Sequence, residues 1–448
     1  MHESVTIRGR PFVLSTPESD AEFEAIVALD AAVHGEGAAA LCRALDAGCP
    51  GMGRGDWYAV LDADGGRVLS TACLIPGQWT YRGAGASVRI GTAEVGIVAT
   101  AEDARGLGLS SFVIRRVMDD ARARGFHLAV IEGIPYFYRR FGFEYAIELS
   151  VQLRLGPGLS PWRAGLAAGP AAVAAGGSGM DDANPPRAGG FSLRLACPDD
   201  IPAIAAWYRQ ACAGLSVLSD RGPELWRHLF GAAQMGIDTA VTRYVIVGPD
   251  GRDAGWLGTQ HDNFGAGLDL VEAGPPSLPT RTVLELADGL RMRAGKPYLT
   301  LDLPTTHPVS RAAMALGAVR RREYAWQVAC PDAAALIAAI RPVAEARLGA
   351  SGWKGRPYRM ALGLYGRSVA MDWDGSSLSV GEAASGTNPD GGDDGPALPP
   401  ELLAPLVLGY RGVAELRALR HDVFVYGDDQ AFLDAAFPRV DSFVYLPY

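Results

Sequence analysis

One segment of the chain has the residue types and the spacing to hold an anionic group. A β-branched run that ends at Thr100 predicts a strand, and a turn with Arg105 and two glycines follows it. Apolar residues at helical spacing begin at Leu109, where the amide groups of a first helical turn converge and the helix dipole adds positive charge. The glycines, Gly106 and Gly108, let the backbone approach a bulky diphosphate. The segment predicts a diphosphate site, and a strand-to-helix connection without a ligand is the alternative.

Two common nucleotide-binding loops do not fit this spacing. A Walker loop needs Lys followed by Ser or Thr after its last glycine, whereas Leu109 and Ser110 follow Gly108 here. A Rossmann fingerprint needs a third glycine and an acidic residue further along the chain, and neither stands at the required position. The turn is therefore neither of these two loops.

The residues before 156 have the pattern of one α/β domain that would position the turn. Alternating and β-branched runs predict strands, and apolar residues at helical spacing predict a helix. The expected strands are 6–14, 57–61, 91–100 and 127–132, and the expected helix is 20–33. We take 1–155 as the first domain.

A Gly-, Ala- and Pro-rich stretch separates this domain from a second one. Residues 156–190 predict a flexible linker or insertion. Residues 191–330 then repeat the order strand, helix, strands and helix, the last helix being 286–294, although the letters differ. The sequence therefore predicts a second α/β domain.

The residues from 331 to 448 predict a third domain. It begins with a helix at 332–344 that is bent or broken near Pro342, because proline removes a helical hydrogen bond. Strands are expected at 359–364 and 367–373, followed by a mobile loop at 382–399.

Composition excludes several classes of protein. With 48% hydrophobic and 20% charged residues in 448, the chain has the composition of a soluble globular protein, and we expect no membrane span and no secretory signal. Its six cysteines form no CxxC pair and stand near no histidine at metal-ligand spacing, which predicts a cytoplasmic protein without a metal. The net charge of −9, concentrated after Met371, argues against a nucleic-acid partner. It would suit a cationic substrate or form a solvated acidic surface.

Two motifs resemble the GNAT acetyltransferase superfamily. The run from Val98 to Ser110, VATAEDARGLGLS, is similar to the acyl-CoA motif R-x-x-G-x-G/A, except that Ser110 replaces Gly or Ala. The run from Phe137 to Glu144, FYRRFGFE, is similar to the family's closing segment FYxxFGFE. The two motifs stand in the family's order with a strand between them, which makes the pair far more specific than either motif alone.

The layout of the whole chain further resembles the Eis (enhanced intracellular survival) acetyltransferases. That resemblance implies an α/β (α+β) fold of tandem GNAT-type mixed sheets flanked by helices, followed by a sterol-carrier-like α/β domain. The expected domains are a catalytic one at 1–155, the linker 156–190, a degenerate GNAT-like one at 191–330 and the sterol-carrier-like one at 331–448. The second is expected to bind no CoA, because 191–330 lacks the Arg-x-x-Gly-x-Gly pattern.

The resemblance assigns a set of residues to acetyl-CoA. The backbone of the strand end would pair with the pantetheine arm, the glycine turn would hold the diphosphate, and the end of the next strand would line the thioester. These positions are Val98, Ala99, Thr100, Arg105, Gly106, Leu107, Gly108, Leu109, Ser110, Ser111, Gly133 and Ile134.

The resemblance also assigns the proton transfers. Tyr138 matches the family's proton donor to the departing thiolate, and the C-terminal carboxylate, here that of Tyr448, matches its proton acceptor. A phenol with an ordinary pKa near ~10 can protonate a thiolate, whereas an α-carboxylate is a weak base unless burial raises its pKa or a water relays the proton. Glu94 is the alternative base, since we expect it on the same strand face as Gly96, Val98 and Thr100.

The sequence thus predicts acetyl-CoA-dependent transfer to a primary amine of a small cationic molecule, such as an aminoglycoside, a polyamine or a lysine side chain. Resemblance alone implies a homo-oligomer, for example a hexamer. The alternative is a non-catalytic sensor or carrier that binds acyl-CoA or a lipid with the same domains. The carboxylates of Tyr448 and Glu94 are both candidates for the base.

Overall fold

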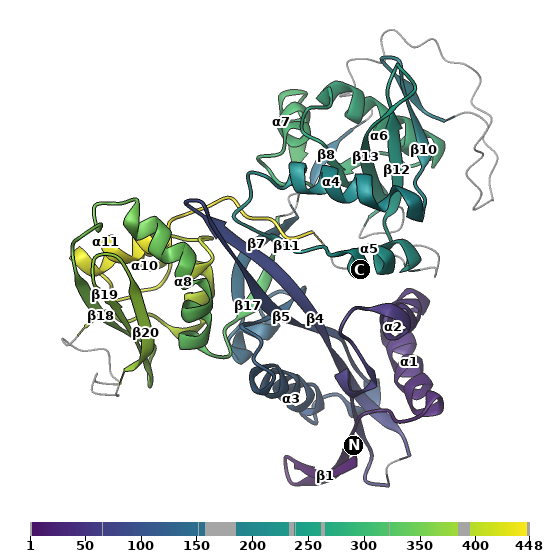
Figure 1. Cartoon of the computed structure of the whole chain (residues 1–448). Helices are drawn as coiled ribbons and strands as arrows, with labels where there is room; N and C mark the ends of the chain where they lie inside the picture. The colour runs from purple at the N-terminus through teal and green to yellow at the C-terminus, as the bar shows by residue number, and fades with distance from the viewer. Residues whose placement is uncertain are drawn as a thin grey trace. The chain divides into compact units, whose positions relative to one another are not determined.

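The computed structural model describes residues 2–64, 66–150, 152–156, 185–232, 237, 239–260, 265–321, 323–383 and 395–445 (Figure 1). The chain forms two compact units, which we describe separately. Among the described residues, the first unit comprises 2–148, 215–220 and 325–445, and the second comprises 149–214 and 221–324.

The first unit contains a nine-stranded mixed sheet. Its strand order is β1-β2-β3-β4-β5-β6-β17-β7, and β11 pairs with β4. Within it, β5 and β6 are parallel, whereas β6 and β17 are antiparallel. The strands are β1 (His2–Ile7), β2 (Arg10–Ser15), β3 (Trp57–Leu61), β4 (Val68–Gly83), β5 (Ala86–Thr100), β6 (Leu128–Ile131), β7 (Glu144–Ser150), β11 (Val217–Ser219) and β17 (Tyr324–Ala329).

Helices cover both faces of this sheet (Figure 1). On one face, α3 (Leu109–Ala123) buries its apolar side against strand residues such as Ala72 and Val95. On the other face lie α1 (Asp20–His34) and α2 (Glu36–Gly48), and the hydroxyl of Thr71, the neighbour of Ala72 in β4, donates to Asp30 of α1 at 2.7 Å. Successive residues of a strand point to opposite faces, so the two helix layers lie on opposite sides of the sheet.

Helix α1 begins with a capping box. The hydroxyl of Ser19 accepts from the backbone N–H of Glu22 at 3.3 Å, and the Glu22 carboxylate accepts from the backbone N–H of Ser19 at 3.1 Å. Each bond satisfies a donor that the first helical turn leaves without an intrahelical partner. The predicted helix 20–33 is therefore present and ends one residue later.

A bulge interrupts the pairing of β4 with β5. Thr71 lies opposite Ala99 and Cys73 opposite Gly96, so Ala72 faces two residues of β5, and one of them, Ile97, has φ 42°. An extra residue shifts the alternation of side chains by one. As a result, Val98 packs with Val95 in the α3-side core. The prediction that Glu94 shares a face with Val98 and Thr100 was wrong for this reason.

The second unit contains an eight-stranded sheet in the order β16-β8-β15-β14-β13-β12-β10-β9. Helix α6 connects β14 and β15, which are neighbouring parallel strands. In the first unit α3 connects β5 and β6 in the same way. The elements of the second unit are β8 (Leu153–Leu155), β9 (Arg187–Ala188), β10 (Phe191–Leu195), α4 (Ile201–Ala211), α5 (Pro223–Ala232), β12 (Thr242–Val247), β13 (Asp253–Gln260), β14 (Leu268–Gly274), α6 (Thr280–Arg293), β15 (Leu299–Leu301), α7 (Pro308–Ala315) and β16 (Val319–Arg320).

Among the described residues after β17, a three-stranded antiparallel sheet is accompanied by four α-helices. The sheet is β18 (Tyr358–Gly363), β19 (Ser368–Trp373) and β20 (Leu378–Ala383), and the helices are α8 (Ala333–Gly349), α9 (Leu403–Val407), α10 (Val413–Leu419) and α11 (Gly427–Ala436). Helix α8 continues through Pro342 to Gly349, so the helix is not broken at that proline, and it ends five residues beyond the predicted end at residue 344. Buried side chains on both sides of it, such as Ile337 and Val343, keep the helix against its neighbours.

Two further predictions differ from the structure. The predicted strand 6–14 is a hairpin of β1 and β2, because Arg8 and Gly9 form a tight turn with φ 51° and 79°. Of the predicted linker 156–190, residues 157–184 lie outside the described residues, and β9 lies near its end. The predicted loop 382–399 also lies largely outside them.

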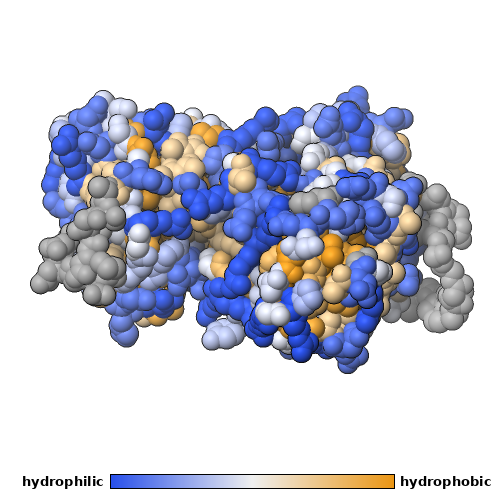
Figure 2. All heavy atoms as spheres, turned by 90° about the horizontal axis from the view of Figure 1, so that it is seen from below, coloured by the Kyte–Doolittle hydropathy of each residue, from blue (hydrophilic) through white to orange (hydrophobic). Residues whose placement is uncertain are grey.

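On the face shown in Figure 2 most of the surface is hydrophilic, and apolar residues gather most densely in one area of that face. None of the helices in the described part of the chain has both the length and the apolar character needed to cross a bilayer.

Candidate active site

The glycine turn links β5 to α3 and leaves the start of that helix without a side-chain cap. Gly106 and Gly108 have φ 81° and 86°, in the left-handed region that favours glycine, and Gly108 is the N-cap residue. Gly108 has no side chain that could accept a hydrogen bond from the first turn of α3. Its amide groups are therefore suited to bind an anion, and Arg105, Ser110 and Ser111 lie in the same stretch.

A second arginine contacts this turn. The Arg8 Nη1 group donates to the carbonyl oxygen of Gly106 at 2.9 Å. A Cβ placed on Gly108 would lie 2.9 Å from Arg8 Nε, so the guanidinium lies close to this residue, whose φ of 86° itself favours glycine. Arg8 did not emerge from the sequence because it stands far from the motif and its hairpin was not predicted.

Strand β5 has an open edge beyond its short pairing with β6. The parallel ladder joins only Thr92–Glu94 to Leu128–Val130, and β5 continues to Thr100. The hydroxyl of Ser70, in β4, donates to the carbonyl of Ala99 at 2.8 Å, so that carbonyl points toward β4. Neighbouring carbonyls in a strand point in opposite directions, and the Val98 carbonyl therefore points toward the open edge.

His34 contacts this edge from the junction of α1 and α2. Its Nε2 lies 3.0 Å from the carbonyl oxygen of Val98, and since a carbonyl only accepts, Nε2 carries the hydrogen. The contact depends on the fold of α1 over β5, which no local pattern indicates.

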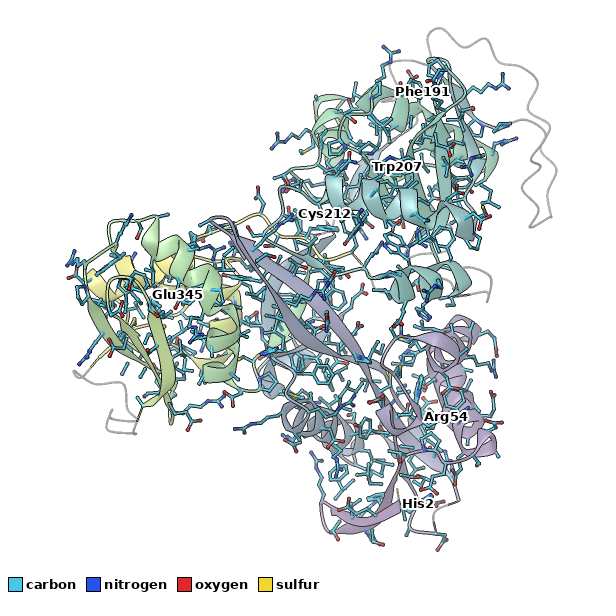
Figure 3. The ribbon with its side chains drawn as sticks, in the orientation of Figure 1. His2, Arg54, Phe191, Trp207, Cys212 and Glu345 are labelled. Carbon is cyan, nitrogen blue, oxygen red and sulfur yellow. The ribbon has the colours of Figure 1, made fainter. Side chains whose placement is uncertain are left out.

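Arg54 links α1 and α2, the two helices that meet at this junction (Figure 3). Its guanidinium pairs with Asp20 of α1 at 2.9 Å and with Asp46 of α2 at 2.7 Å. It also lies over the ring of Phe23, 4.1 Å from the centroid. These contacts fix α1 and α2 beside the open edge.

The end of β6 is shaped by a glycine beneath an aromatic ring. A Cβ on Gly133 would lie 2.3 Å from the ring of Tyr138, so only glycine leaves room for that ring. Tyr138 is buried and packs edge-on against Phe137 and Phe143, with centroids 4.9 and 6.0 Å away. Ile134, the other residue predicted to line the thioester, is 64% exposed.

Strand β17 joins Gly133 to the last described residues of the chain. The side-chain amide of Gln327 donates to the Gly133 carbonyl at 2.8 Å, and the indole N–H of the neighbouring Trp326 donates to the Val444 carbonyl at 3.3 Å. Phe443, Val444 and Tyr445 are buried. The predicted base, the carboxylate of Tyr448, lies outside the described residues.

Glu94, the alternative base, is buried in β5 opposite Ile75 of β4 and Val130 of β6. Burial raises the pKa of the Cys49 thiol to about 12, and the charge of Glu94 adds to that shift. Glu94 therefore lies near Cys49, which follows α2, and faces the side of the sheet that α1 and α2 cover.

The corresponding connection in the second unit is built differently. Between β14 and α6 stand Pro275, Pro276 and Pro279, and the N-cap residue is Pro279. Proline has no backbone N–H, so this connection offers fewer amide donors to an anion than the glycine turn does.

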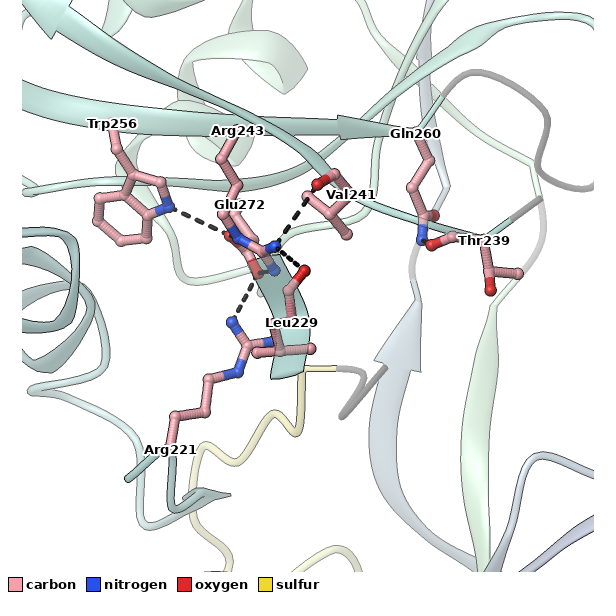
Figure 4. Close-up of polar contacts among 8 residues, drawn as sticks. All are labelled: Arg221, Leu229, Thr239, Val241, Arg243, Trp256, Gln260 and Glu272. Atoms are coloured by element: carbon pink, nitrogen blue, oxygen red, sulfur yellow. Dashed lines mark hydrogen bonds and ion pairs between the residues drawn. The ribbon is translucent and has the colours of Figure 1, made fainter. Parts of the chain in front are cut away.

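A buried ion cluster stabilises the second sheet (Figure 4). Glu272 accepts from Arg221 at 2.6 Å, from Arg243 at 2.9 Å and from the indole of Trp256 at 3.2 Å. Burial alone would raise the pKa of Glu272, but the two guanidinium groups outweigh burial and hold it well below its ordinary value. Removing one partner of such a buried group leaves an uncompensated charge, so the cluster has a structural role.

No group of three or more His, Cys, Asp and Glu side chains in the described ranges is arranged to hold a metal ion. The candidate site thus consists of the glycine turn, the open edge of β5 and the pair Gly133–Tyr138.

The family model of the acetyltransferase (GNAT) domain matches residues 17–146, which include β5, the glycine turn, α3 and Tyr138. This part of the chain is a GNAT acetyltransferase domain. The fold of such a domain binds acyl-CoA, and the chain is therefore an enzyme of acyl transfer. No curated protein sequence matches the chain significantly.

Solved structures share the fold over nearly the whole chain. A GCN5-related N-acetyltransferase from Kribbella flavida has 15% identity and a TM-score of 0.61, covering 98% of this chain and 100% of its own. One from Anabaena variabilis has 12% identity and a TM-score of 0.62, covering 97% and 99%. Eis1 from Mycobacterium abscessus has 16% identity and a TM-score of 0.57, covering 98% and 100%. The likeness extends well beyond the GNAT domain and concerns the fold alone.

Proposed function

We propose that the chain transfers the acetyl group of acetyl-CoA directly to a primary amine of a small cationic molecule. The observation that carries this proposal is the placement of the uncapped helix start, the open strand edge and the Gly133–Tyr138 pair within one GNAT domain. Each corresponds to one part of the donor: the diphosphate, the pantetheine arm and the thioester.

The glycine turn and β5 are the proposed donor site. The diphosphate would lie against Arg105 and the amides from Gly106 to Ser111, because these groups supply N–H donors and positive charge. The backbone of Val98–Thr100 would pair with the pantetheine arm as a neighbouring strand would. An N–H of this stretch can also stabilise the thioester oxygen as it becomes negative.

Tyr138 is the proposed proton donor. The amine nitrogen forms a bond to the thioester carbon, the carbon–sulfur bond breaks, and the phenol gives its proton to the departing sulfur. Its burial beside Gly133 supports this role, since a fixed ring keeps the hydroxyl in one place.

A carboxylate is the proposed acceptor of the proton that the amine loses. The terminal carboxylate of Tyr448 is the first candidate, and the burial of Phe443–Tyr445 supports it, because a mobile tail would leave these residues exposed. Glu94 is the second candidate, and its burial in β5 supports it.

The remaining domains are proposed to support this one site. We assign 1–155 to catalysis, 156–190 to a linker, 191–330 to a second GNAT-like domain without CoA, and 331–448 to a sterol-carrier-like domain. The prolines before α6 and the likeness to Eis1 support this assignment. A homo-oligomer is proposed on resemblance alone, and a cytoplasmic location is proposed on the spacing of the six cysteines.

The test is to mix the protein with acetyl-CoA and a panel of amines, including an aminoglycoside, a polyamine and lysine, and to follow free thiol. We expect thiol release only when an amine is present, with mass spectrometry showing one added acetyl group. Binding of acetyl-CoA without amine-dependent thiol would instead identify a non-catalytic carrier and refute the proposed activity.

A further inference from the structure

The glycine turn carries little positive charge for a site that holds a diphosphate. Between residues 101 and 111, Arg105 is the one cationic residue, whereas Glu102 and Asp103 are acidic. Arg67 compensates Asp103, with both guanidinium-to-carboxylate distances at 2.7 Å. The residues of the turn therefore supply too little positive charge to balance the negative charge of a bound diphosphate.

Arg8 brings a second cation to this turn from the β1–β2 hairpin. Its Nη1 donates to the carbonyl oxygen of Gly106, and its Nε lies where a Cβ on Gly108 would meet it at 2.9 Å. A guanidinium has further N–H groups in a planar fork that matches phosphate oxygens. The bond to Gly106 thus orients the guanidinium beside the amides that begin α3.

The backbone at Arg8 gives an independent indication. Ile7 and Arg10 pair across the hairpin, so Arg8 and Gly9 form a two-residue turn, and both have positive φ. Glycine or asparagine is favoured in such a turn, and a residue with a Cβ raises the free energy of the left-handed conformation. Local stability does not explain an arginine at this position. Strained residues of this kind concentrate at functional sites.

We propose that Arg8 binds the diphosphate of coenzyme A beside the glycine turn. This inference rests on the proposed function, in which acetyl-CoA is the donor. It predicts that Arg8 contributes to donor selection: the enzyme should prefer acetyl-CoA to S-acetyl-pantetheine, which lacks the diphosphate.

The experiment compares three variants and two donors. Arg8→Gln removes the charge, and Arg8→Gly also removes the backbone strain. Arg10→Gln is the matched control, because Arg10 is exposed in the same hairpin. Coenzyme A binding is measured by calorimetry, and kcat/KM is measured with acetyl-CoA and with S-acetyl-pantetheine.

For both Arg8 variants we expect CoA affinity and kcat/KM with acetyl-CoA to fall about tenfold, as for the loss of one charge-assisted hydrogen bond. The kcat/KM with S-acetyl-pantetheine should stay at the wild-type value. The salt dependence of CoA binding should also weaken, because one cation fewer faces the anion. Arg8→Gly should melt at or above the wild-type temperature while binding CoA less tightly.

Three results would overturn the inference. Equal losses with both donors would mean that Arg8 only shapes the turn, and unchanged CoA affinity would mean that it does not touch the diphosphate. A similar loss in Arg10→Gln would show a general charge effect of the hairpin. In all three cases wild-type CoA binding would still support the proposed function, whereas a wild-type protein that binds no CoA would refute that function itself.

Discussion

Gln327 donates its side-chain amide to the carbonyl of Gly133 at 2.8 Å, although the two residues stand 194 positions apart in the chain. Gly133 follows β6 and lies beneath Tyr138, while Gln327 belongs to β17, which pairs with β6 in register Gln327–Ile131. Gly133, which is proposed to line the thioester, is thus held in place by a strand that begins at Tyr324. The GNAT domain depends on that strand to complete the proposed active site.

Replacing Gln327 by Leu should impair catalysis more than donor binding. The buried Gly133 carbonyl would lose a donor, which costs about 1–3 kcal/mol of stability and allows the end of β6 to move. We expect kcat to fall about tenfold or more, because a small displacement near the reacting atoms is costly. The CoA dissociation constant should change little, since the diphosphate site is at α3. A matching rise in that constant would contradict this separation.

Trp326→Phe tests the neighbouring contact of β17 separately. It keeps an aromatic ring in β17 but removes the indole N–H that donates to Val444. We expect it to loosen the C-terminal segment without altering Gly133. Protease digestion from the C-terminus, followed by mass spectrometry, would show this loosening as faster cleavage than in Gln327→Leu.

Tyr138→Phe should slow turnover strongly and leave donor binding nearly unchanged. Loss of a general acid lowers rates by about 10²–10⁴-fold, whereas the ring that packs on Gly133 remains in place. Single-turnover thiol release and CoA calorimetry measure the two effects. Tyr136→Phe is the control, because Tyr136 is a neighbouring tyrosine that is 79% exposed. Wild-type turnover in Tyr138→Phe would remove the proposed acid role.

Two variants decide which carboxylate accepts the proton. Deleting Tyr448 moves the terminal carboxylate back by about 3.5 Å along the chain, and Glu94→Gln removes the other candidate charge. If the terminus is the base, the deletion should lower kcat about 10²-fold or more and Glu94→Gln should not. Tyr448→Phe keeps the terminal carboxylate and is the control. An intact rate after the deletion would exclude the terminal base.

Part of the site could be predicted from the sequence because local patterns determine it. The order of strand, glycine turn and helix from β5 to α3 depends on neighbouring residues, and positive φ at Gly106 and Gly108 needs only the absence of a Cβ. Strand β3 has the predicted bounds Trp57–Leu61 for the same reason. Tyr138 could be singled out because it belongs to a motif of neighbouring residues, the run from Phe137 to Glu144.

The remaining features depend on contacts between distant segments, which a local pattern does not contain. The bulge at Ile97 arises from the pairing of β4 with β5, and it reversed the expected alternation after Gly96. Arg8 meets Gly106 only because a hairpin folds over the turn, and Gln327 reaches Gly133 only through sheet order.

His34→Ala should tighten donor binding. His34 donates to the Val98 carbonyl at 3.0 Å, and the pantetheine arm would need that same carbonyl at the open edge of β5. Binding would then have to displace the imidazole, which costs about one hydrogen bond, or about 0.5–1.5 kcal/mol. We expect the CoA dissociation constant to fall about 2- to 10-fold in calorimetry. Weaker binding would show instead that His34 supports the donor rather than competing with it.

Asp30→Asn should change how stability depends on pH. Asp30 is fully buried in α1, where its carboxylate oxygens accept from Thr71 at 2.7 Å and from the Cys42 thiol at 3.5 Å. Burial raises the pKa of Asp30 to about 7, and these two hydrogen bonds oppose the rise. The folded protein therefore prefers the protonated acid.

The sign of the effect follows from this preference. Below about pH 4 the carboxyl is protonated in both the folded and the unfolded chain, and its ionisation has no effect on stability. As the pH rises from about 4 to about 7, the unfolded chain releases its proton while the folded one keeps it, so the free energy of unfolding falls. Above about pH 7 the full penalty of about 4 kcal/mol is present.

Asparagine at position 30 does not ionise and therefore has no such penalty. Urea unfolding should therefore show that the advantage of Asp30→Asn over wild type grows by about 2–3 kcal/mol between about pH 5 and about pH 8. The exposed Asp64→Asn is the control and should show no such growth. A constant difference between Asp30→Asn and wild type across this range would mean that Asp30 is already ionised in the fold at about pH 5.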